Sequence, residues 1–289
     1  MGIVIPLEDR EKKTTAGLDS LLELIRPDLE RTNQLILQRT GSDVTTIPEV
    51  ANHLISAGGK RLRPMLVLAT AGMCGYKGDG QIKFAAGIEF MHTATLLHDD
   101  VVDESDMRRG KIAARMLWGN ETCVLVGDFL LGHAFKMMVE PGVLPCLTVV
   151  SSAAAIIAEG EILQLNAAKD TQTTEDAYMA VIRRKTAELF AAAAEVGVML
   201  AGRSKADEAA ARSYGMNLGI AFQLIDDALD YGGSSAKLGK NVGDDFARAR
   251  SRFPSCSPSV AAARKNANSG AARWKRAKST TATSKPPAA

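Results

Sequence analysis

The 289-residue chain contains few aromatic residues, four cysteines and no long apolar run. Because no two cysteines form a C-x-x-C pair, paired-cysteine chemistry is not expected, and a reducing cytoplasm is the simplest location. No stretch has the ~18 uninterrupted apolar residues that cross a bilayer. The first 19 residues carry Glu8, Asp9 and Glu11, which excludes a signal peptide. We therefore expect a soluble, cytoplasmic protein without an integral membrane segment.

Charge and hydrophobicity are unevenly distributed along the chain. The content of 46% hydrophobic and 24% charged residues is typical of a globular protein with one large or two small domains. The segment from Ala247 onward holds ten Lys and Arg and no Asp or Glu, so residues 1–246 carry a net charge of −8 within a chain of net charge +2. The acidic body and the basic tail are thus expected to differ in structure.

Helical periodicity dominates the body, and no convincing strand is present. Thr174, followed by Glu175 and Asp176, is a plausible helix N-cap. The sequence predicts an all-α bundle with ligand chemistry in its core between facing helices. The predicted helices span 19–38, 46–57, 64–74, 82–105, 121–138, 147–167, 174–201 and 205–231.

Two clusters of aspartates share one pattern, D-D-x-x-D, and lie in apolar, helix-patterned sequence. Within each cluster the first and last carboxylates lie one helical turn apart on one face. Carboxylates in such surroundings are costly to bury unless cations neutralise them, and facing clusters suit Mg²⁺ ions with a phosphate ligand. The clusters consist of Asp99, Asp100 and Asp103, and of Asp226, Asp227 and Asp230.

Basic residues near the first cluster are suited to diphosphate. Arg108 and Arg109 follow it closely, and arginine offers a planar fork of donors to phosphate oxygens. Lys60 and Arg63 follow two glycines that permit close backbone approach. His92 lies two turns before Asp99 on the same helix face, where it is either a phosphate contact or a core histidine. Solvated salt bridges are the alternative for all these charges.

These residues fall within motifs of a known family. The resemblance covers about residues 20–246 and is to the trans-polyprenyl diphosphate synthases, with the surroundings of the first motif most similar to long-chain, octaprenyl-type enzymes. The motifs that carry it are G-K-R-L-R-P at 59–64, H-T-A-T-L-L-H-D-D-V-V-D at 92–103, M-R-R-G at 107–110, F-Q-L-I-D-D-A-L-D-Y at 222–231 and K-N-V-G-D-D at 240–245.

The resemblance implies an isoprenoid-synthase type helical bundle with its active site in the central cavity. It implies a Mg²⁺-dependent enzyme that adds isopentenyl diphosphate repeatedly to an allylic diphosphate such as farnesyl diphosphate, making a long all-trans chain for a quinone. A homodimer and no nucleic-acid partner are expected. By the resemblance, the six aspartates hold Mg²⁺ and are catalytic; Lys60, Arg63, His92 and Arg109 bind isopentenyl diphosphate; Arg108, Lys185, Thr186, Gln223 and Lys240 bind the allylic diphosphate.

Product length is expected to depend on small residues before the first aspartate motif. Ala94 and Thr95 lie five and four residues before Asp99, where short-chain relatives carry bulky aromatics that stop elongation. Small side chains here favour a long product, although Ala94 also suits a helix for its propensity alone.

The tail from Ala247 departs from the family pattern. After Gly243-Asp244-Asp245-Phe246 the family usually continues Arg-Glu-Gly-Lys, a variable residue, then Thr-Leu-Pro. Permitted codons for residues 247–257 yield Arg-Glu-Gly-Lys-Ile-Thr-Leu-Pro-Val-Val-Leu once a single C is placed after the Phe246 codon. We therefore interpret 1–246 as a C-terminally incomplete synthase domain and 247–289 as a disordered frameshift product. The alternative is a genuine basic tail that touches nucleic acid or membrane.

Two other functions remain open at this stage. A non-catalytic subunit of a heteromeric synthase is disfavoured by the intact aspartate motifs. A terpene cyclase on the same scaffold is disfavoured by the basic loop and His92, which would serve a second diphosphate.

Overall fold

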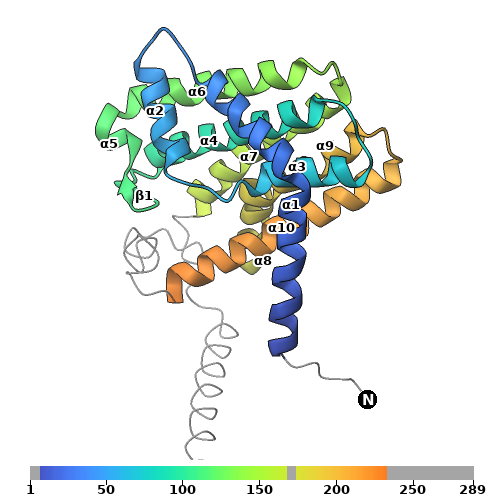
Figure 1. The fold of residues 1–289 in the computed structure, drawn as a ribbon. Coiled ribbons are helices and arrows are strands. Elements are labelled where there is room, and N and C mark those ends of the chain that lie inside the picture. Colours follow the sequence, from blue (N-terminus) through green and yellow to red (C-terminus); the bar gives the residue numbers. More distant parts are fainter. Residues whose placement is uncertain (1–6, 168–173, 233–289) are drawn as a thin grey trace, which may run out of the picture.

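The protein, represented by a computed structural model, is described over residues 7–167 and 174–232 and is almost entirely helical there (Figure 1). Side chains are described from residue 19 to 229 outside the gap. The elements in chain order are α1 (Leu7–Arg39), α2 (Thr46–Ser56), α3 (Leu62–Met73), α4 (Gly80–Val102), β1 (Met107–Arg108), β2 (Lys111–Ile112), α5 (Ala114–Trp118), α6 (Asn120–Val139), α7 (Leu144–Ala167), α8 (Glu175–Ile182), the π-helical turn η1 (Arg183–Ala187), α9 (Glu188–Leu200) and α10 (Lys205–Gly232).

The all-α prediction is confirmed, with three differences in detail. The first helix begins at Leu7 rather than near residue 19. A two-stranded antiparallel hairpin, β1–β2, forms around Arg109 and Gly110, so the expectation of no strand is wrong at this turn. The predicted helix 174–201 is divided by η1 into α8 and α9. The sequence did not predict this division, because a single π-helical turn does not change the hydrophobic periodicity. Thr174 is the N-cap as predicted, its side chain accepting from the Ala177 amide at 3.2 Å.

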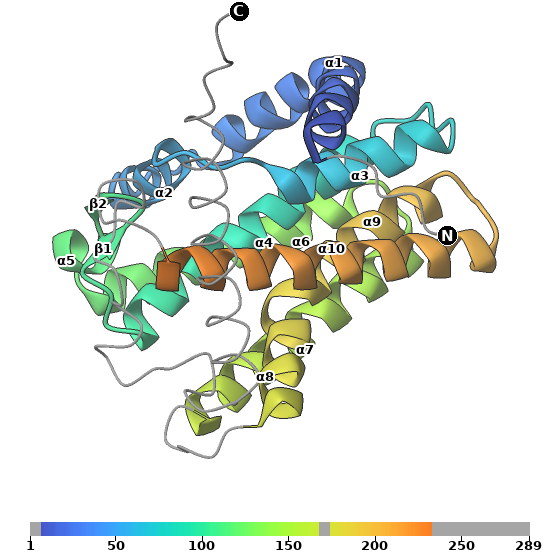
Figure 2. The same ribbon diagram turned by 90° about the horizontal axis from the view of Figure 1, so that it is seen from below.

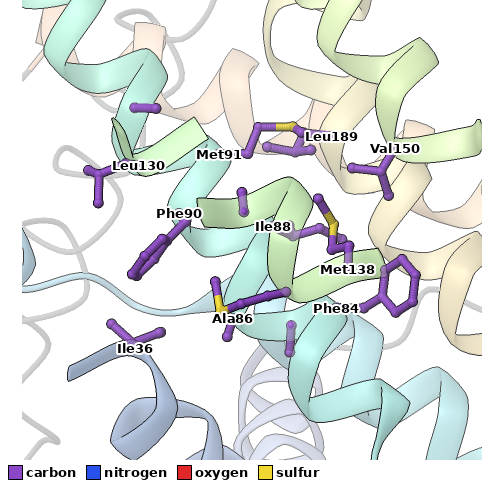
Figure 3. Packing of buried hydrophobic residues seen from close by; sticks show 14 of the residues in the cluster. Ile36, Phe84, Ala86, Ile88, Phe90, Met91, Leu130, Met138, Val150 and Leu189 are labelled. Atoms are coloured by element: carbon purple, nitrogen blue, oxygen red, sulfur yellow. The ribbon is translucent and has the colours of Figure 1, made fainter. Parts of the chain in front are cut away.

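Helix α4 lies at the centre of the bundle. It packs most extensively against α6, and also against α1, α3 and α9. Its side chains are buried on nearly every face, and Phe84, Ile88 and Phe90 form the core with Leu130 and Met138 of α6 (Figure 3). A helix with this all-round burial is a rigid support, so residues at its C-terminal end are held firmly in place.

A second group of helices packs against α3 and α4. Helix α9 contacts α3, α7 and α10, and α8 runs beside α7 (Figure 2). Helix α10 crosses the bundle and ends on the same side of the molecule as the β1–β2 hairpin (Figures 1 and 2). The aspartate motifs therefore lie at the C-terminal parts of two helices that belong to different layers.

Two helices, α6 and α7, are long and apolar enough to cross a membrane by length and composition. Core helices of soluble proteins pass the same test, so the expected absence of a membrane segment stays a prediction.

Candidate active site

The first aspartate motif lies at the end of α4, with Asp99 and Asp100 in its last turn and Asp103 as its C-cap. Successive helical residues are rotated by about 100°, so adjacent carboxylates point in different directions. Asp100 points inward and is fully buried, whereas Asp99 and Asp103 are partly exposed. The predicted shared face of Asp99 and Asp103 is thus the one that is open to a ligand.

Arg108 from the β1–β2 hairpin holds Asp100 in place. The Arg108 Nε donates to Asp100 Oδ1 at 2.7 Å, and Nη2 lies 2.7 Å from the same oxygen. Burial raises the pKa of Asp100 above its ordinary value, although the arginine opposes this. Within the described part of the chain, Asp100 Oδ2 is buried without a hydrogen-bond partner. The pair ties the hairpin to the end of α4 and leaves one carboxylate oxygen for a further ligand.

Lys185 approaches the first motif from η1. Its Nζ donates to Glu161 Oε2 of α7 at 2.6 Å and lies 3.7 Å from Asp99 Oδ2. Burial and the negative charge of Asp99 raise the pKa of Glu161 to about 7, despite the opposing charge of Lys185. Sequence reasoning did not identify Glu161. An acidic residue within the apolar stretch of α7 was the available signal.

The π-helical turn η1 places neighbouring side chains in two networks. Lys185 contacts the first aspartate motif, while Thr186 donates its hydroxyl to Gln223 Oε1 of α10 at 2.8 Å. Single π turns inside α-helices frequently occur at functional sites, because the extra residue changes where side chains point. The turn therefore connects the two halves of the candidate site.

The second aspartate motif is held by neutral donors. Gln223 Nε2 donates to Asp227 Oδ1 at 2.8 Å, and the Tyr178 hydroxyl donates to Asp227 Oδ2 at 2.5 Å. Asp227 and Gln223 are buried, whereas Asp226 is exposed. Tyr178 is a second residue that sequence reasoning missed. The side chain of Asp230 and all of Lys240 lie outside the described residues.

A basic cluster lies between the loop before α3 and the hairpin. Arg61 pairs with the buried Glu89 of α4, and Arg109 donates to the Gly58 carbonyl oxygen. Arg63 lies with its guanidinium carbon 4.3 Å from the centre of the Phe190 ring. Burial lowers the pKa of Arg63 to about 10, and also lowers that of Arg109. The cluster holds several desolvated positive charges.

His92 belongs to this cluster. Loss of hydration, with the positive charges of Arg63 and Arg109, holds the pKa of its imidazole well below 6.5. A neutral imidazole can still donate one hydrogen bond to a phosphate oxygen. The expected role of His92 in binding isopentenyl diphosphate stays a prediction.

Three other predicted residues have different surroundings. Lys60 is exposed in the loop before α3. Ala94 is 1% exposed and packs in the core, while Thr95 is partly buried and donates its hydroxyl to the His92 carbonyl oxygen at 2.8 Å. The roles expected for these residues stay predictions.

Backbone strain concentrates around the site. Arg61, Glu104 and Arg109 are the non-glycine residues with positive φ in the described ranges, at 49°, 48° and 50°. Such conformations cost about 1–3 kcal/mol each and persist where surrounding structure imposes them. All three flank the aspartates or the basic cluster, so the backbone strain supports this region as the candidate site.

The donor set suits a hard cation bound together with a phosphate ligand. Among the side chains that the structure describes, no three acidic, histidine or cysteine residues converge as a ready-made metal cage. Mg²⁺ usually retains waters and binds through one or two carboxylates plus substrate phosphates, so it does not require such a cage. The partly exposed Asp99 and Asp103 and the unpaired Asp100 Oδ2 fit this type of binding.

Comparison with known sequences points in the same direction. The sequence model described as polyprenyl synthetase matches residues 44–283. Octaprenyl diphosphate synthase of Escherichia coli is 49% identical over 238 residues, which span 82% of this chain and 74% of that protein.

Solved structures share the fold. A polyprenyl synthase from Caulobacter crescentus, complexed with calcium and isoprenyl diphosphate, is 53% identical with a TM-score of 0.77 and covers 80% of this chain and 70% of its own. A decaprenyl diphosphate synthase from Rhodobacter capsulatus is 52% identical with a TM-score of 0.76, and the match covers 80% of this chain and 71% of that one.

Proposed function

We propose, on the premise that the chain belongs to the polyprenyl synthetase family, that its two aspartate motifs hold Mg²⁺ on the diphosphate of an allylic isoprenoid substrate. The enzyme is a prenyltransferase that makes long-chain all-trans polyprenyl diphosphates, as the octaprenyl and decaprenyl synthases among its relatives do. The observation that carries the substrate assignment is the convergence of Lys185, Arg108 and the first aspartate motif at the end of α4.

The metal is proposed to be Mg²⁺. The six aspartates of the two motifs are assigned as its ligands. Asp100 and Asp227 also accept hydrogen bonds from protein donors, which orient the two motifs. When bound, Mg²⁺ neutralises charge on the leaving diphosphate. The calcium in the related Caulobacter crescentus complex supports a divalent oxygen-bound cation.

The allylic diphosphate is assigned to Arg108, Lys185, Thr186, Gln223 and Lys240. Arg108 and Lys185 supply charge to phosphate oxygens, and this stabilises the diphosphate as the allylic C–O bond ionises. Thr186 and Gln223 hold the turn and α10 together, so the two cationic side chains keep their orientation.

The second substrate, isopentenyl diphosphate, is assigned to Lys60, Arg63, His92 and Arg109. The basic cluster offers fixed positive charge near the first motif, because its member His92 lies two turns before Asp99 on α4. With its diphosphate held there, the double bond attacks the allylic carbocation, and the departed diphosphate takes the proton. No nucleophilic side chain is needed for this step.

Product length is proposed to depend on Ala94 and Thr95, which lie on α4 before the first motif. Ala94→Phe places a large ring in a position that is now 1% exposed, so growth of the chain should stop earlier. The expected result is a shift to shorter products, measured by chromatography of dephosphorylated polyprenols. Because overpacking costs about 1–3 kcal/mol, the melting temperature is measured in parallel. An unchanged length distribution in a folded variant would contradict this role.

The assembly is proposed to be a cytoplasmic homodimer that serves quinone side-chain synthesis and binds no nucleic acid. Helices α6 and α7 carry exposed apolar residues, including Leu125, Leu144 and Ile162, at 67%, 69% and 59% exposure. Covering them with a second copy would remove apolar area from water, which favours association. Sedimentation velocity should report twice the 30.7 kDa chain mass.

The segment 247–289 is proposed to be a frameshift product appended to an incomplete synthase domain. It lies outside the described residues, and the support is the recovered family sequence at residues 247–257. Sequencing the gene across the Phe246 codon tests this. A gene that contains the extra C would place the single-base loss in the reading of the sequence. A gene without it, together with tail peptides in the purified protein, would exclude such a reading error.

The activity is tested with labelled isopentenyl diphosphate, farnesyl diphosphate and Mg²⁺. A long polyprenyl diphosphate that disappears with EDTA is expected. Incorporation without elongation beyond one unit would contradict long-chain synthesis. Cyclisation of the allylic substrate without consumption of isopentenyl diphosphate would favour a terpene cyclase, and activity only after mixing with another subunit would favour a heteromeric enzyme.

A further inference from the structure

Glu161 of α7 lies beside the candidate site but belongs to neither aspartate motif. Its carboxylate accepts a hydrogen bond from Lys185 Nζ at 2.6 Å, while the same ammonium lies 3.7 Å from Asp99 Oδ2. Lys185 is therefore shared unequally between two carboxylates, with the closer contact to Glu161. Both contacts are largely shielded from water, which strengthens them relative to surface pairs.

The backbone of α7 is shaped to receive η1. A Cβ added at Gly160 would lie 2.7 Å from the Lys185 backbone nitrogen and 2.8 Å from Arg184 Cβ. Only glycine permits this approach, so α7 and the π turn are in direct backbone contact. Glu161, the next residue, is consequently fixed at the distance of one hydrogen bond from the Lys185 side chain.

The position of Lys185 matters for the metal. Without a competing partner, an ammonium 3.7 Å from Asp99 would close to hydrogen-bond distance, because charge-assisted pairs prefer about 2.7–2.9 Å. Such a pair would occupy the carboxylate oxygen that is assigned to Mg²⁺. An acceptor on the opposite side prevents this closure.

We propose that Glu161 is a positioning residue that holds Lys185 away from Asp99, so that Asp99 stays available to the metal and Lys185 to the diphosphate. This inference rests on the proposed function in assigning Lys185 and Asp99 to the diphosphate and the metal. Gly160 contributes by allowing the close approach of α7 and η1.

The test compares Glu161→Ala, Glu161→Gln and the control Glu159→Ala, which changes an exposed carboxylate on the same helix. Calorimetry at pH 8 measures binding of inorganic diphosphate to the full chain as Mg²⁺ is varied. We expect the Mg²⁺ concentration at half-saturation to rise about tenfold in Glu161→Ala, since loss of a residue that orients a ligand typically costs 10–100-fold in metal affinity. Glu161→Gln keeps an acceptor for Lys185 and should fall between Glu161→Ala and the control.

Turnover supplies a second readout. The KM for farnesyl diphosphate should rise in Glu161→Ala while kcat changes little, because the lost interaction concerns binding geometry. Equal effects of Glu161→Gln and Glu161→Ala would show that charge alone matters and would overturn the proposal, as would an unshifted Mg²⁺ requirement. A Glu161→Ala chain that does not fold would make the residue structural and would also overturn it. If the unaltered chain does not elongate farnesyl diphosphate, the proposed function is refuted. The comparison of diphosphate binding among the variants would still test the role of Glu161.

Discussion

The two aspartate motifs have identical spacing but different surroundings. The inward carboxylate of the first, Asp100, is paired with the guanidinium of Arg108, and charged groups such as Lys185 and Glu161 surround its neighbours. The inward carboxylate of the second, Asp227, accepts hydrogen bonds from Tyr178 and Gln223. One sequence pattern is therefore supported by different neighbours: an arginine holds the inward carboxylate of the first motif, and a tyrosine and a glutamine donate to that of the second.

The largest effect should come from removing the outward carboxylate of either motif. Asp99→Ala and Asp226→Ala should each lower kcat/KM about 10³-fold, because a metal interaction worth several kcal/mol in the transition state is lost. The exposed Asp43→Ala is the control and should be neutral. Steady-state kinetics at saturating Mg²⁺ measure this. A large effect at one motif alone would contradict a catalytic role for the other motif, which would then be structural.

The next effect concerns the charged pair of the first motif. Arg108→Ala should lower the free energy of unfolding by roughly 2 kcal/mol, since it leaves the buried Asp100 carboxylate without its partner. Adding Asp100→Asn should recover part of this loss, because the unpaired charge is gone. Urea unfolding of both variants measures the difference. A double variant no more stable than the single one would contradict the ion-pair account.

His92 should make the free energy of unfolding depend on pH. Its pKa in the folded protein lies well below the unfolded value of about 6.5, so the unfolded chain binds the proton more readily. The free energy of unfolding should therefore fall as pH drops below about 6.5, by at most about 1.4 kcal/mol per pH unit from this group. Urea unfolding at pH 6.5 and 5.5 should show a smaller decrease for His92→Gln. Identical decreases would contradict a neutral His92.

The smallest effect is expected at the neutral hydrogen bonds of the second motif. Tyr178→Phe should cost about 1 kcal/mol, the usual contribution of one such bond, and less than Arg108→Ala. Tyr214→Phe is a matched control, because Tyr214 is 61% exposed on α10. Thermal unfolding of the two variants gives the comparison. A loss larger than that of Arg108→Ala would reverse the proposed contrast.

Much of the fold could be predicted from the sequence, because apolar spacing directly reflects which helix faces are buried. The helices carrying the aspartate motifs and the basic loop before α3 are examples. The sequence does not distinguish Asp99 from Asp100, since which of two adjacent carboxylates points inward depends on how α4 packs. Arg108 binding Asp100 likewise required the hairpin, which two-residue strands do not reveal.

The contributions of Glu161 and Tyr178 could not be predicted for a related reason. Each meets its partner only because α7, η1 and α10 lie side by side, and sequence separation gives no measure of that. The π turn that directs Lys185 and Thr186 to different motifs also lacks a periodicity signal. Long-range packing, rather than local propensity, decides these positions.

Both aspartate motifs are proposed to bind the diphosphate of one allylic substrate through divalent metal ions. A crystal structure of the chain with Mn²⁺, which shares the preference of Mg²⁺ for oxygen ligands, and an unreactive thio-analogue of farnesyl diphosphate would test it directly. Anomalous scattering should locate metal at Asp99 and Asp103 and at Asp226, with the diphosphate between them and Lys185 in contact. Metal at only one motif, or a diphosphate bound away from α4 and α10, would contradict joint binding by the two motifs.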